Sequence, residues 1–213
     1  MVIQALPVAT SRLLGASASI TSPVSLVKEL IDNAIDAEAT SIEVQISSDT
    51  LTKIQVRDNG CGINLDDFDN LARRSHTSKL TSFEQLQAGE IATLGFRGDA
   101  LSHANMMANL SITTRTRHDP IGTKADLKFG EGGVQKTQPV SSLIGTTIRA
   151  TDLFKSLPVR RQNHLKEGRK PINRVKELLQ AYALARPCIK LSLKVLGDEK
   201  SSWDYCPASD RTA

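Results

Sequence analysis

The strongest constraint that the sequence places on this fold is a segment with apolar residues at helical spacing, followed by two segments in which apolar and polar residues alternate. Residues 23–37 repeat leucine, isoleucine and valine at helical spacing, with Ser22 and Pro23 suited to the cap and first turn of a helix. Residues 41–46 and 53–57 then alternate apolar and polar side chains, as strands with one buried face do. The sequence therefore predicts a helix and then a β-hairpin, which indicates an α/β protein.

Further elements are predicted along the rest of the chain. Helices are expected over residues 65–73 with Asn64 as the cap, from about residue 97 to 107, and over residues 160–184 with a break near 168–171. Hydrophobic residues make up 39% of the chain, which suffices for a packed core. The remaining predicted strands are residues 110–115, 123–129, 146–150 and 188–196.

Composition argues against several kinds of protein. No apolar run approaches the roughly 18 residues of a membrane span, so no membrane partner is expected. The first residues lack the pattern of a signal peptide. Cys61, Cys188 and Cys206 are too widely spaced for a zinc site, and such sparse cysteines fit a reducing compartment such as the cytosol or nucleus.

The predicted helix 23–37 contains a candidate catalytic pair. Glu29 and Asn33 are four residues apart, so their Cβ atoms should be about 5–6 Å apart on one face of the helix. Asp32 and Asp36 fall near the same side. A carboxylate can take a proton from water, and an amide oxygen suits Mg²⁺. Taken alone, however, the pair is better explained as part of a solvated polar stripe.

A glycine-containing loop at residues 58–62 follows the second predicted strand. An aspartate fixed at the end of a strand, Asp58, can accept a hydrogen bond from an exocyclic amine. Gly60 and Gly62 would let a ligand approach the backbone closely. An ordinary Asn-Gly turn is the alternative interpretation.

A second glycine loop, Gly95-Phe96-Arg97-Gly98, precedes the next predicted helix. Glycine N–H groups at a helix N-terminus can bind phosphate. Upstream, Thr77, Ser78 and Lys79 offer two hydroxyls and an ammonium group for the same anion, unless they form a solvated loop. The sequence has no Walker A motif, so a phosphate site here would be of another kind.

Together these motifs resemble the Bergerat nucleotide site of gyrase, Hsp90, histidine kinases and MutL. The similarity to MutL-type DNA mismatch-repair proteins is closer and extends over about residues 3–195, and residues 6–14 resemble the eukaryotic post-meiotic-segregation branch. The resemblance implies a two-layer α/β sandwich, in which helices cover one face of a mixed, mostly antiparallel sheet. The matching segments are residues 27–37, 57–60, 76–79, 93–98, 145–147 and 153–160.

The resemblance also implies a role for each motif. Glu29 would position and deprotonate the attacking water, and Asn33 would ligate Mg²⁺. Asp58, helped by Thr146, would bind the adenine amino group of ATP. The other expected nucleotide contacts are Gly60, Gly62, Leu101 and the lid residues Thr77, Ser78, Lys79, Gly95, Phe96, Arg97 and Gly98.

Some positions depart from the family pattern. Asp99 replaces a glutamate, residues 15–20 replace a Gly-Glu-Val segment, and Glu38 replaces a glycine. If position 38 has a positive φ, Glu38 costs roughly 1 kcal/mol.

The resemblance also predicts the domain organisation. Residues 1–200 would form the ATP-binding domain, and residues 201–213 would begin a second domain that supplies a lysine to the γ-phosphate. Residue 213 precedes most of that second domain, so the resemblance predicts weak hydrolysis for this chain.

Charge is distributed unevenly along the chain. Residues 1–107 hold 8 Lys and Arg against 13 Asp and Glu, whereas residues 108–213 hold 19 against 10. From Lys155 to Lys176 there are eight basic residues and one glutamate. Such a run attracts DNA phosphates without recognising sequence, although a solvated helix face is an equally good interpretation. Aromatic residues are only 4% of the chain, which argues against base stacking on single strands.

Two functions are compatible with these features. The first is an ATPase in which slow Mg-dependent hydrolysis switches the conformation of a repair scaffold; Glu29 favours it. For this function the resemblance implies a nuclear location, a heterodimer with another MutL homologue, and mismatch-recognition proteins as partners. The second is a DNA-binding or dimerisation module that does not hydrolyse ATP. A protein kinase fits less well, because the sequence contains no phospho-acceptor histidine module.

Overall fold

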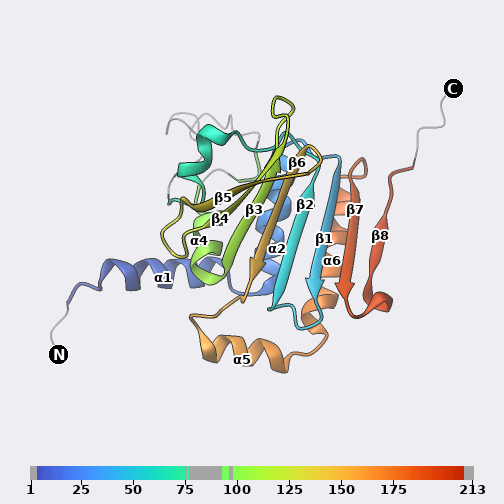
Figure 1. Ribbon diagram of the computed structural model, residues 1–213. Coiled ribbons are helices and arrows are strands. Elements are labelled where there is room, and N and C mark those ends of the chain that lie inside the picture. Colours follow the sequence, from blue (N-terminus) through green and yellow to red (C-terminus); the bar gives the residue numbers. More distant parts are fainter. Residues whose placement is uncertain (1–3, 75, 77–92, 96–97, 209–213) are drawn as a thin grey trace, which may run out of the picture.

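The computed structural model describes residues 4–74, 76, 93–95 and 98–208. Its framework is an eight-stranded sheet with the order β5-β4-β3-β6-β2-β1-β7-β8 (Figure 1). Neighbouring strands are antiparallel, except that β1 and β7 run parallel. The strands are β1 (Ser41–Ser47), β2 (Lys53–Asp58), β3 (Asn109–Arg115), β4 (Gly122–Leu127), β5 (Val134–Val140), β6 (Gly145–Thr151), β7 (Lys190–Leu196) and β8 (Trp203–Tyr205).

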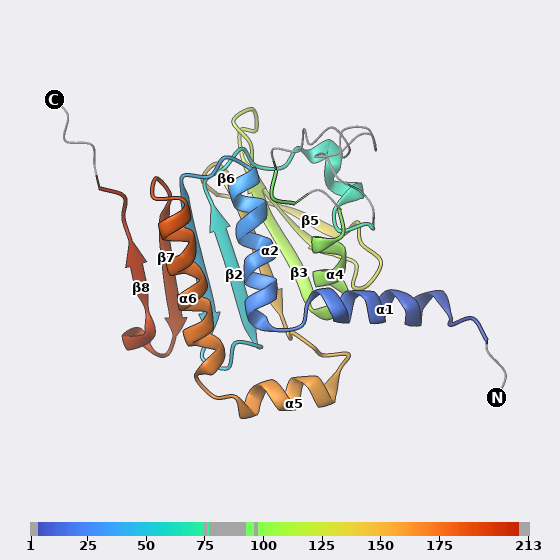
Figure 2. The same ribbon diagram turned by 180° about the vertical axis from the view of Figure 1, so that it is seen from behind.

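Two long helices, α2 (Pro23–Asp36) and α6 (Lys170–Ala185), cover one face of the sheet (Figure 2). The predicted two-layer α/β arrangement, with a mostly antiparallel sheet and helices on one face, is therefore confirmed. The other described helices are α1 (Val8–Ser19), α4 (Ala100–Met107), α5 (Pro158–Lys166) and the short 3-10 helices η1 (Leu65–Asn70) and η2 (Glu199–Ser201).

Helix α2 starts at a capping box and is held by its apolar face. Ser22 Oγ accepts a hydrogen bond from Ser25 N at 3.2 Å, and Ser25 Oγ accepts one from Ser22 N at 3.1 Å. Leu26 and Leu30 are buried beneath the helix, and every second residue of β1 is buried as well. Each such side chain contributes roughly 1.5–3 kcal/mol on burial, so the polar side of α2 is fixed relative to the sheet.

Other predicted elements differ from the structure. The predicted helix 65–73 is wrong in type and length, because the 3-10 helix η1 ends at Asn70 and the Asn64 side chain makes no capping bond. Helix α1 and strands β5 and β8 were not predicted. Strand β5 lacks an alternating pattern because it is an exposed edge strand, where Pro139 is tolerated.

Two further expectations concern the chain after α2 and the end of the sheet. Glu38 has a φ of 60°, which is the positive φ that was expected to strain any residue other than glycine at this position. Strand β8 pairs with β7, so the sheet continues past residue 200, and the start of a second domain there stays a prediction. Within the described residues, no helix is both long and apolar enough to cross a membrane.

Candidate nucleotide site

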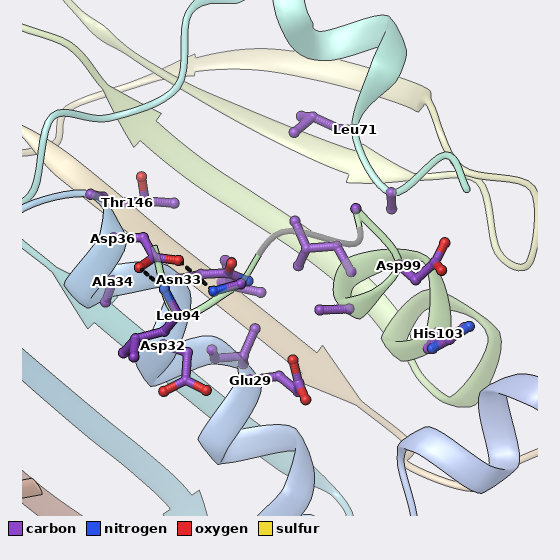
Figure 3. Close-up of a pocket in the computed structure, with 18 of the residues that line it drawn as sticks. Glu29, Asp32, Asn33, Ala34, Asp36, Leu71, Leu94, Asp99, His103 and Thr146 are labelled. Carbon is purple, nitrogen blue, oxygen red and sulfur yellow. Dashed lines mark hydrogen bonds between the residues drawn. The ribbon is translucent and has the colours of Figure 1, made fainter. Parts of the chain in front are cut away.

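A cavity of about 1410 Å³ lies between α2, η1, α4 and the beginning of β6. Figure 3 shows Glu29 and Asn33 of α2 on one side, and Asp99, which precedes α4, and His103 of α4 on the other. Carboxylates dominate its charged groups, since Lys28 is the one lysine or arginine among the described lining residues. The carboxylates belong to Glu29, Asp32, Asp36, Asp58, Asp67 and Asp99.

Asp32 joins α2 to α6. Its carboxylate is buried, pairs with Lys28 Nζ at 2.5 Å and accepts a hydrogen bond from the Tyr182 hydroxyl. Burial, and then this bond, raise the pKa of Tyr182 above its usual value. Asp32 therefore positions the helix.

Asp36 anchors the second glycine loop. Its Oδ1 accepts a hydrogen bond from Leu94 N at 2.8 Å, and its Oδ2 accepts one from Gly95 N at 3.0 Å (Figure 3). The last turn of α2 thus holds the backbone of Leu94 and Gly95. The sequence placed Asp36 near the catalytic pair but indicated no partner for it.

Glu29 differs from Asp32 and Asp36 in having no such partner. It is half-buried and lines the cavity, and no described residue forms a hydrogen bond or ion pair with its carboxylate. Asn33, one helical turn further, also lines the cavity. The helix therefore presents one carboxylate available to a ligand or water beside one amide.

Asp58 is held at the end of β2 by two backbone groups. Its Oδ1 accepts hydrogen bonds from Gly60 N at 2.9 Å and from Thr146 N at 3.1 Å. Burial raises the pKa of Asp58, and these bonds partly oppose the effect. No described residue bonds Oδ2, so this oxygen can accept a hydrogen bond from a ligand in a fixed orientation.

Asn59 fixes the loop that follows Asp58. Its Oδ1 accepts hydrogen bonds from Thr40 N at 2.9 Å and Ser41 N at 2.8 Å, and its Nδ2 donates to Thr40 Oγ1 at 2.8 Å. The side chain thus connects the loop to the start of β1. The sequence indicated only a turn here.

The glycines of this loop serve close backbone packing. A Cβ on Gly60 would lie 2.5 Å from Ala37 O, which also accepts a hydrogen bond from Cys61 N at 3.0 Å. Gly62 has a φ of 80°, and a Cβ there would lie 2.5 Å from Arg115 O. Both glycines stand behind the cavity wall rather than among its lining residues.

Thr114 was missed by the sequence analysis. This buried residue of β3 accepts a hydrogen bond from Ile63 N at 2.9 Å and donates to Gly145 O at 3.2 Å. Its hydroxyl also lies 3.3 Å from Thr146 Oγ1. It therefore joins the Asp58 loop to the start of β6. Alternation predicts that Thr114 is buried but does not predict these partners.

The remaining predicted contacts fall into two groups. Gly95, Gly98, Leu101 and Thr146 line the cavity together with Glu29, Asn33 and Asp58. The predicted lid residues Thr77, Ser78, Lys79, Phe96 and Arg97 lie outside the described residues.

Metal binding at this site would depend on few protein ligands. In the part of the chain that the structure describes, no group of three or more His, Cys, Asp and Glu side chains is arranged to hold a metal. Asn33 lines the cavity, and its side chain contains an amide oxygen of the kind that Mg²⁺ binds. Mg²⁺ keeps several waters and binds substrate phosphates, so such a sparse oxygen donor set fits Mg²⁺ bound together with a nucleotide.

Comparison with known proteins places this chain in a family. Residues 20–156 match the family of histidine kinase-, DNA gyrase B- and HSP90-like ATPases. PMS1 protein homolog 1 of Homo sapiens is 42% identical over 188 residues, which is 87% of this chain and 20% of the human protein. The DNA mismatch repair protein MutL of Ralstonia nicotianae is 34% identical over 200 residues, 94% of this chain and 30% of that protein.

Solved structures show the same similarity. The crystal structure of the N-terminal domain of a DNA repair protein has a TM-score of 0.76 and 31% identity, covering 90% of this chain and 55% of that one. The Aquifex aeolicus MutL ATPase domain complexed with ADP has a TM-score of 0.64 and 27% identity, covering 88% and 65%. The chain spans between 20% and 30% of the length of the two curated relatives.

Proposed function

The chain belongs to the histidine kinase-, DNA gyrase B- and HSP90-like ATPase family and within it is of the MutL type, and we propose that its large cavity binds Mg-ATP and slowly hydrolyses it. In this proposal, the nucleotide cycle switches the conformation of a DNA mismatch-repair protein. The proposal rests on the cavity between α2 and the Asp58 loop and on the relative complexed with ADP.

Asp58 binds the adenine amino group in this proposal. Its Oδ1 is occupied by Gly60 N and Thr146 N, so Oδ2 is the acceptor for the amine. Because the loop is fixed by Asn59 and by the contact of Gly60 with Ala37, the acceptor is already oriented before the nucleotide arrives.

Glu29 acts as the base that orients and deprotonates the attacking water. The observation that carries this assignment is the contrast along α2, where the carboxylates of Asp32 and Asp36 are engaged and that of Glu29 has no described partner. A half-buried carboxylate on the cavity wall is placed to accept a proton from water. Asn33 Oδ1 is the proposed protein ligand of Mg²⁺, which when bound would neutralise phosphate charge in this acidic cavity.

Nucleotide titration followed by phosphate-release measurements tests this assignment. Glu29→Ala should keep ATP affinity and lose roughly 100- to 10,000-fold in turnover. Asn33→Ala should lose the Mg-dependent part of binding. Asp67→Ala is the matched control, since this exposed carboxylate lines the same cavity without an assigned role, and it should retain turnover.

Two results would change the conclusion. Equal turnover in Glu29→Ala and the unmodified protein would reject Glu29 as the base. ATP binding without any turnover in the unmodified protein would instead favour a non-hydrolysing DNA-binding or dimerisation module.

DNA is the proposed partner of the basic segment from Lys155 to Lys176. Helix α5 within it has no buried residue, and Lys166 and Lys170 are exposed without an ion pair to a described residue. Arg169 and Arg174 differ, because they pair with Asp198 and Glu167. The lysines are therefore the better candidates for phosphate contacts.

The wider biological role rests on the family. We propose that the protein acts in mismatch repair in the nucleus, as a heterodimer with another MutL homologue and together with mismatch-recognition proteins. Co-purification of the protein with a second MutL homologue from nuclear extract, retained at high salt, is the measurement that tests the heterodimer.

A further inference from the structure

A second cavity of about 540 Å³ lies beside the nucleotide cavity and has the opposite charge. It is formed by α1, α4, the residues after η1 and the turn between β4 and β5. Helix α1 packs against α4 (Figure 2), and Gly15 and His103 line both cavities. The charged lining residues of this basic cavity are Arg12, Arg73, Arg74, Lys128 and Glu131.

The turn that carries Lys128 is fixed onto the chain that carries the arginines. Gly133 N donates a hydrogen bond to Leu71 O at 2.7 Å. Gly132 has a φ of 76°, and a Cβ there would lie 2.4 Å from Ala72 O. Such close packing of two backbones keeps Lys128 and Arg73 on one cavity.

The same turn is also bound to α4. Asn105 Nδ2 donates to Lys128 O at 2.6 Å, and Gly130 N donates to Asn105 O at 3.2 Å. Asn105 is almost fully buried, so this attachment is part of the core. Two of the three segments that carry the cations, the chain after η1 and the turn between β4 and β5, are therefore attached to each other, and the third, α1, packs against α4.

Most of these cations form no ion pair within the described part of the chain, although Glu131 also lines the cavity. Arg74 lies 4.0 Å from Asp99, whereas no described residue forms an ion pair with Arg12, Arg73 or Lys128. Three unpaired cations around one cavity repel one another unless an anion lies between them. An anionic ligand with several oxygen atoms, such as a phosphate group, fits this arrangement.

The basic cavity adjoins the basic segment. Phe129 follows Lys128, and Lys155 Nζ lies 3.6 Å from the centroid of the Phe129 ring. Lys155 is the first residue of the segment proposed to contact DNA. Through Phe129 the basic cavity therefore lies close to the first lysine of the basic segment, so one nucleic-acid backbone with its repeating phosphates could contact both.

We propose that the basic cavity binds phosphate groups of a DNA backbone that also contacts the basic segment. This inference rests on the proposed function, specifically on DNA as a partner. It adds a binding site next to the nucleotide cavity, with Arg12, Arg73 and Lys128 as the phosphate ligands.

The test compares two double variants that remove the same charge. Arg12→Gln with Lys128→Gln changes the basic cavity, whereas Lys190→Gln with Lys194→Gln changes exposed lysines of β7 near the other end of the sheet. Affinity for a fluorescent DNA duplex is measured by anisotropy over a salt series. Each lost phosphate contact reduces the slope of log K against log salt by about 0.9, so the cavity variant should lose about 1.8 and the β7 variant almost nothing.

Further arms separate the possible causes of failure. ATP affinity is measured in both variants and should be unchanged, which shows that the proteins are folded and that the nucleotide site is intact. Equal slopes in the two variants, or an unchanged slope in the cavity variant, would overturn the proposal. If only Lys166→Gln with Lys170→Gln weakens DNA binding, DNA remains a partner but the cavity is not its site.

Inorganic phosphate provides the last arm. Calorimetric titration that shows phosphate binding lost in the cavity variant, in a protein that does not bind the duplex, would identify a site for a free anion. That result would overturn both the DNA inference and the proposed DNA partner, while leaving the ATP assignment unaffected.

Discussion

The two walls of the nucleotide cavity are held in different ways. The Asp58 wall is fixed by backbone groups from several elements, through Gly60 N, Thr146 N and the Asn59 side chain. The α2 wall is a single helix, fixed by its cap, its apolar face and the bond between Asp32 and the Tyr182 hydroxyl.

Because of this difference, we expect the Asp58 wall to determine nucleotide binding and the α2 wall to carry the residue that acts in hydrolysis. Changes in the Asp58 wall alter the position of a ligand acceptor together with the packing of the loop. On the α2 wall, Asp32 and Asp36 hold structure while Glu29 faces the cavity without a described partner. Substitutions that displace the backbone of the first wall should therefore lower affinity and stability together, whereas substitutions of single side chains on the second wall should affect them separately.

Gly60→Ala should have the largest effect, because it disrupts the backbone contact of Gly60 with Ala37, where the two walls meet. The new Cβ would meet Ala37 O at 2.5 Å, and backbone must move to relieve the overlap. We expect a loss of about 3 kcal/mol in the free energy of unfolding and loss of ATP binding. Urea denaturation and ATP titration measure both effects.

The control for this variant is Gly15→Ala on α1. No heavy atom lies within 4 Å of a Cβ at that position, and alanine favours a helix over glycine by up to about 1 kcal/mol. The control should therefore be at least as stable as the unmodified protein. If both variants behave alike, the contact with Ala37 does not join the walls.

Asp58→Asn should weaken ATP affinity by about tenfold to a hundredfold, or 1.5–3 kcal/mol, because an amide donor would replace the acceptor for the adenine amine. The free energy of unfolding, in contrast, should not fall at neutral pH. Burial raises the pKa of Asp58, so the folded state binds its proton more tightly than the unfolded chain does. The stabilisation that protonated Asp58 gives the folded state is present at low pH and is lost as pH rises through the folded pKa. Asparagine carries no ionisable proton, so the variant does not lose stability over this pH range.

The variant should consequently be as stable as the unmodified protein, or more stable, at neutral pH. This advantage should vanish as the pH falls below the range in which Asp58 ionises. Urea midpoints over a pH series provide the measurement. An asparagine variant that is less stable at neutral pH contradicts the assignment.

Tyr182→Phe tests the α2 wall and should cost about 1 kcal/mol, because buried Asp32 loses one of its partners. The pKa of Tyr182 is raised in the folded state. The protonated hydroxyl therefore stabilises the fold below the ordinary tyrosine pKa of 10.0, and this stabilisation is lost as pH rises above that value. Thermal unfolding in alkaline buffers should therefore show a loss that the phenylalanine variant lacks. ATP affinity should remain near that of the unmodified protein.

Glu38→Gly should have the smallest effect, a gain of up to about 1 kcal/mol, because residue 38 has a φ of 60° immediately after the turn that joins the walls. Glu38→Asn should give part of this gain, since asparagine tolerates this conformation better than most residues. Glu38→Ala controls for loss of the charge and should give no gain. Denaturation midpoints of the three variants decide between strain and charge.

The sequence predicted those parts of the fold that depend on local periodicity. Helix α2 and the strands β1 and β2 follow from apolar spacing, which local chain geometry converts into a buried face. Helix α1 was missed because its start has no capping hydrogen bond and only Ala16 is buried. Strand β5 was missed because it is exposed along most of its length.

For the site, the sequence predicted which residues line the cavity better than it predicted the hydrogen bonds that hold them. Glu29, Asn33 and Asp58 do line one cavity. The bonds from Leu94 N to Asp36 and from Ile63 N to Thr114 join segments far apart in the chain, and no local pattern encodes such distances. The basic cavity was missed for the same reason, since Arg12, Arg73 and Lys128 meet only in three dimensions.

The parallel pairing of β1 with β7 has a consequence for biosynthesis. Ser41 pairs with Lys190, so β1 emerges from the ribosome long before the strand that covers its second edge. Until then, a strand with alternating apolar residues has an open edge, which is a template for aggregation and a target for chaperones. Helix α2 lies over this incomplete sheet, so nascent chains should acquire ATP affinity only when synthesis has passed β7.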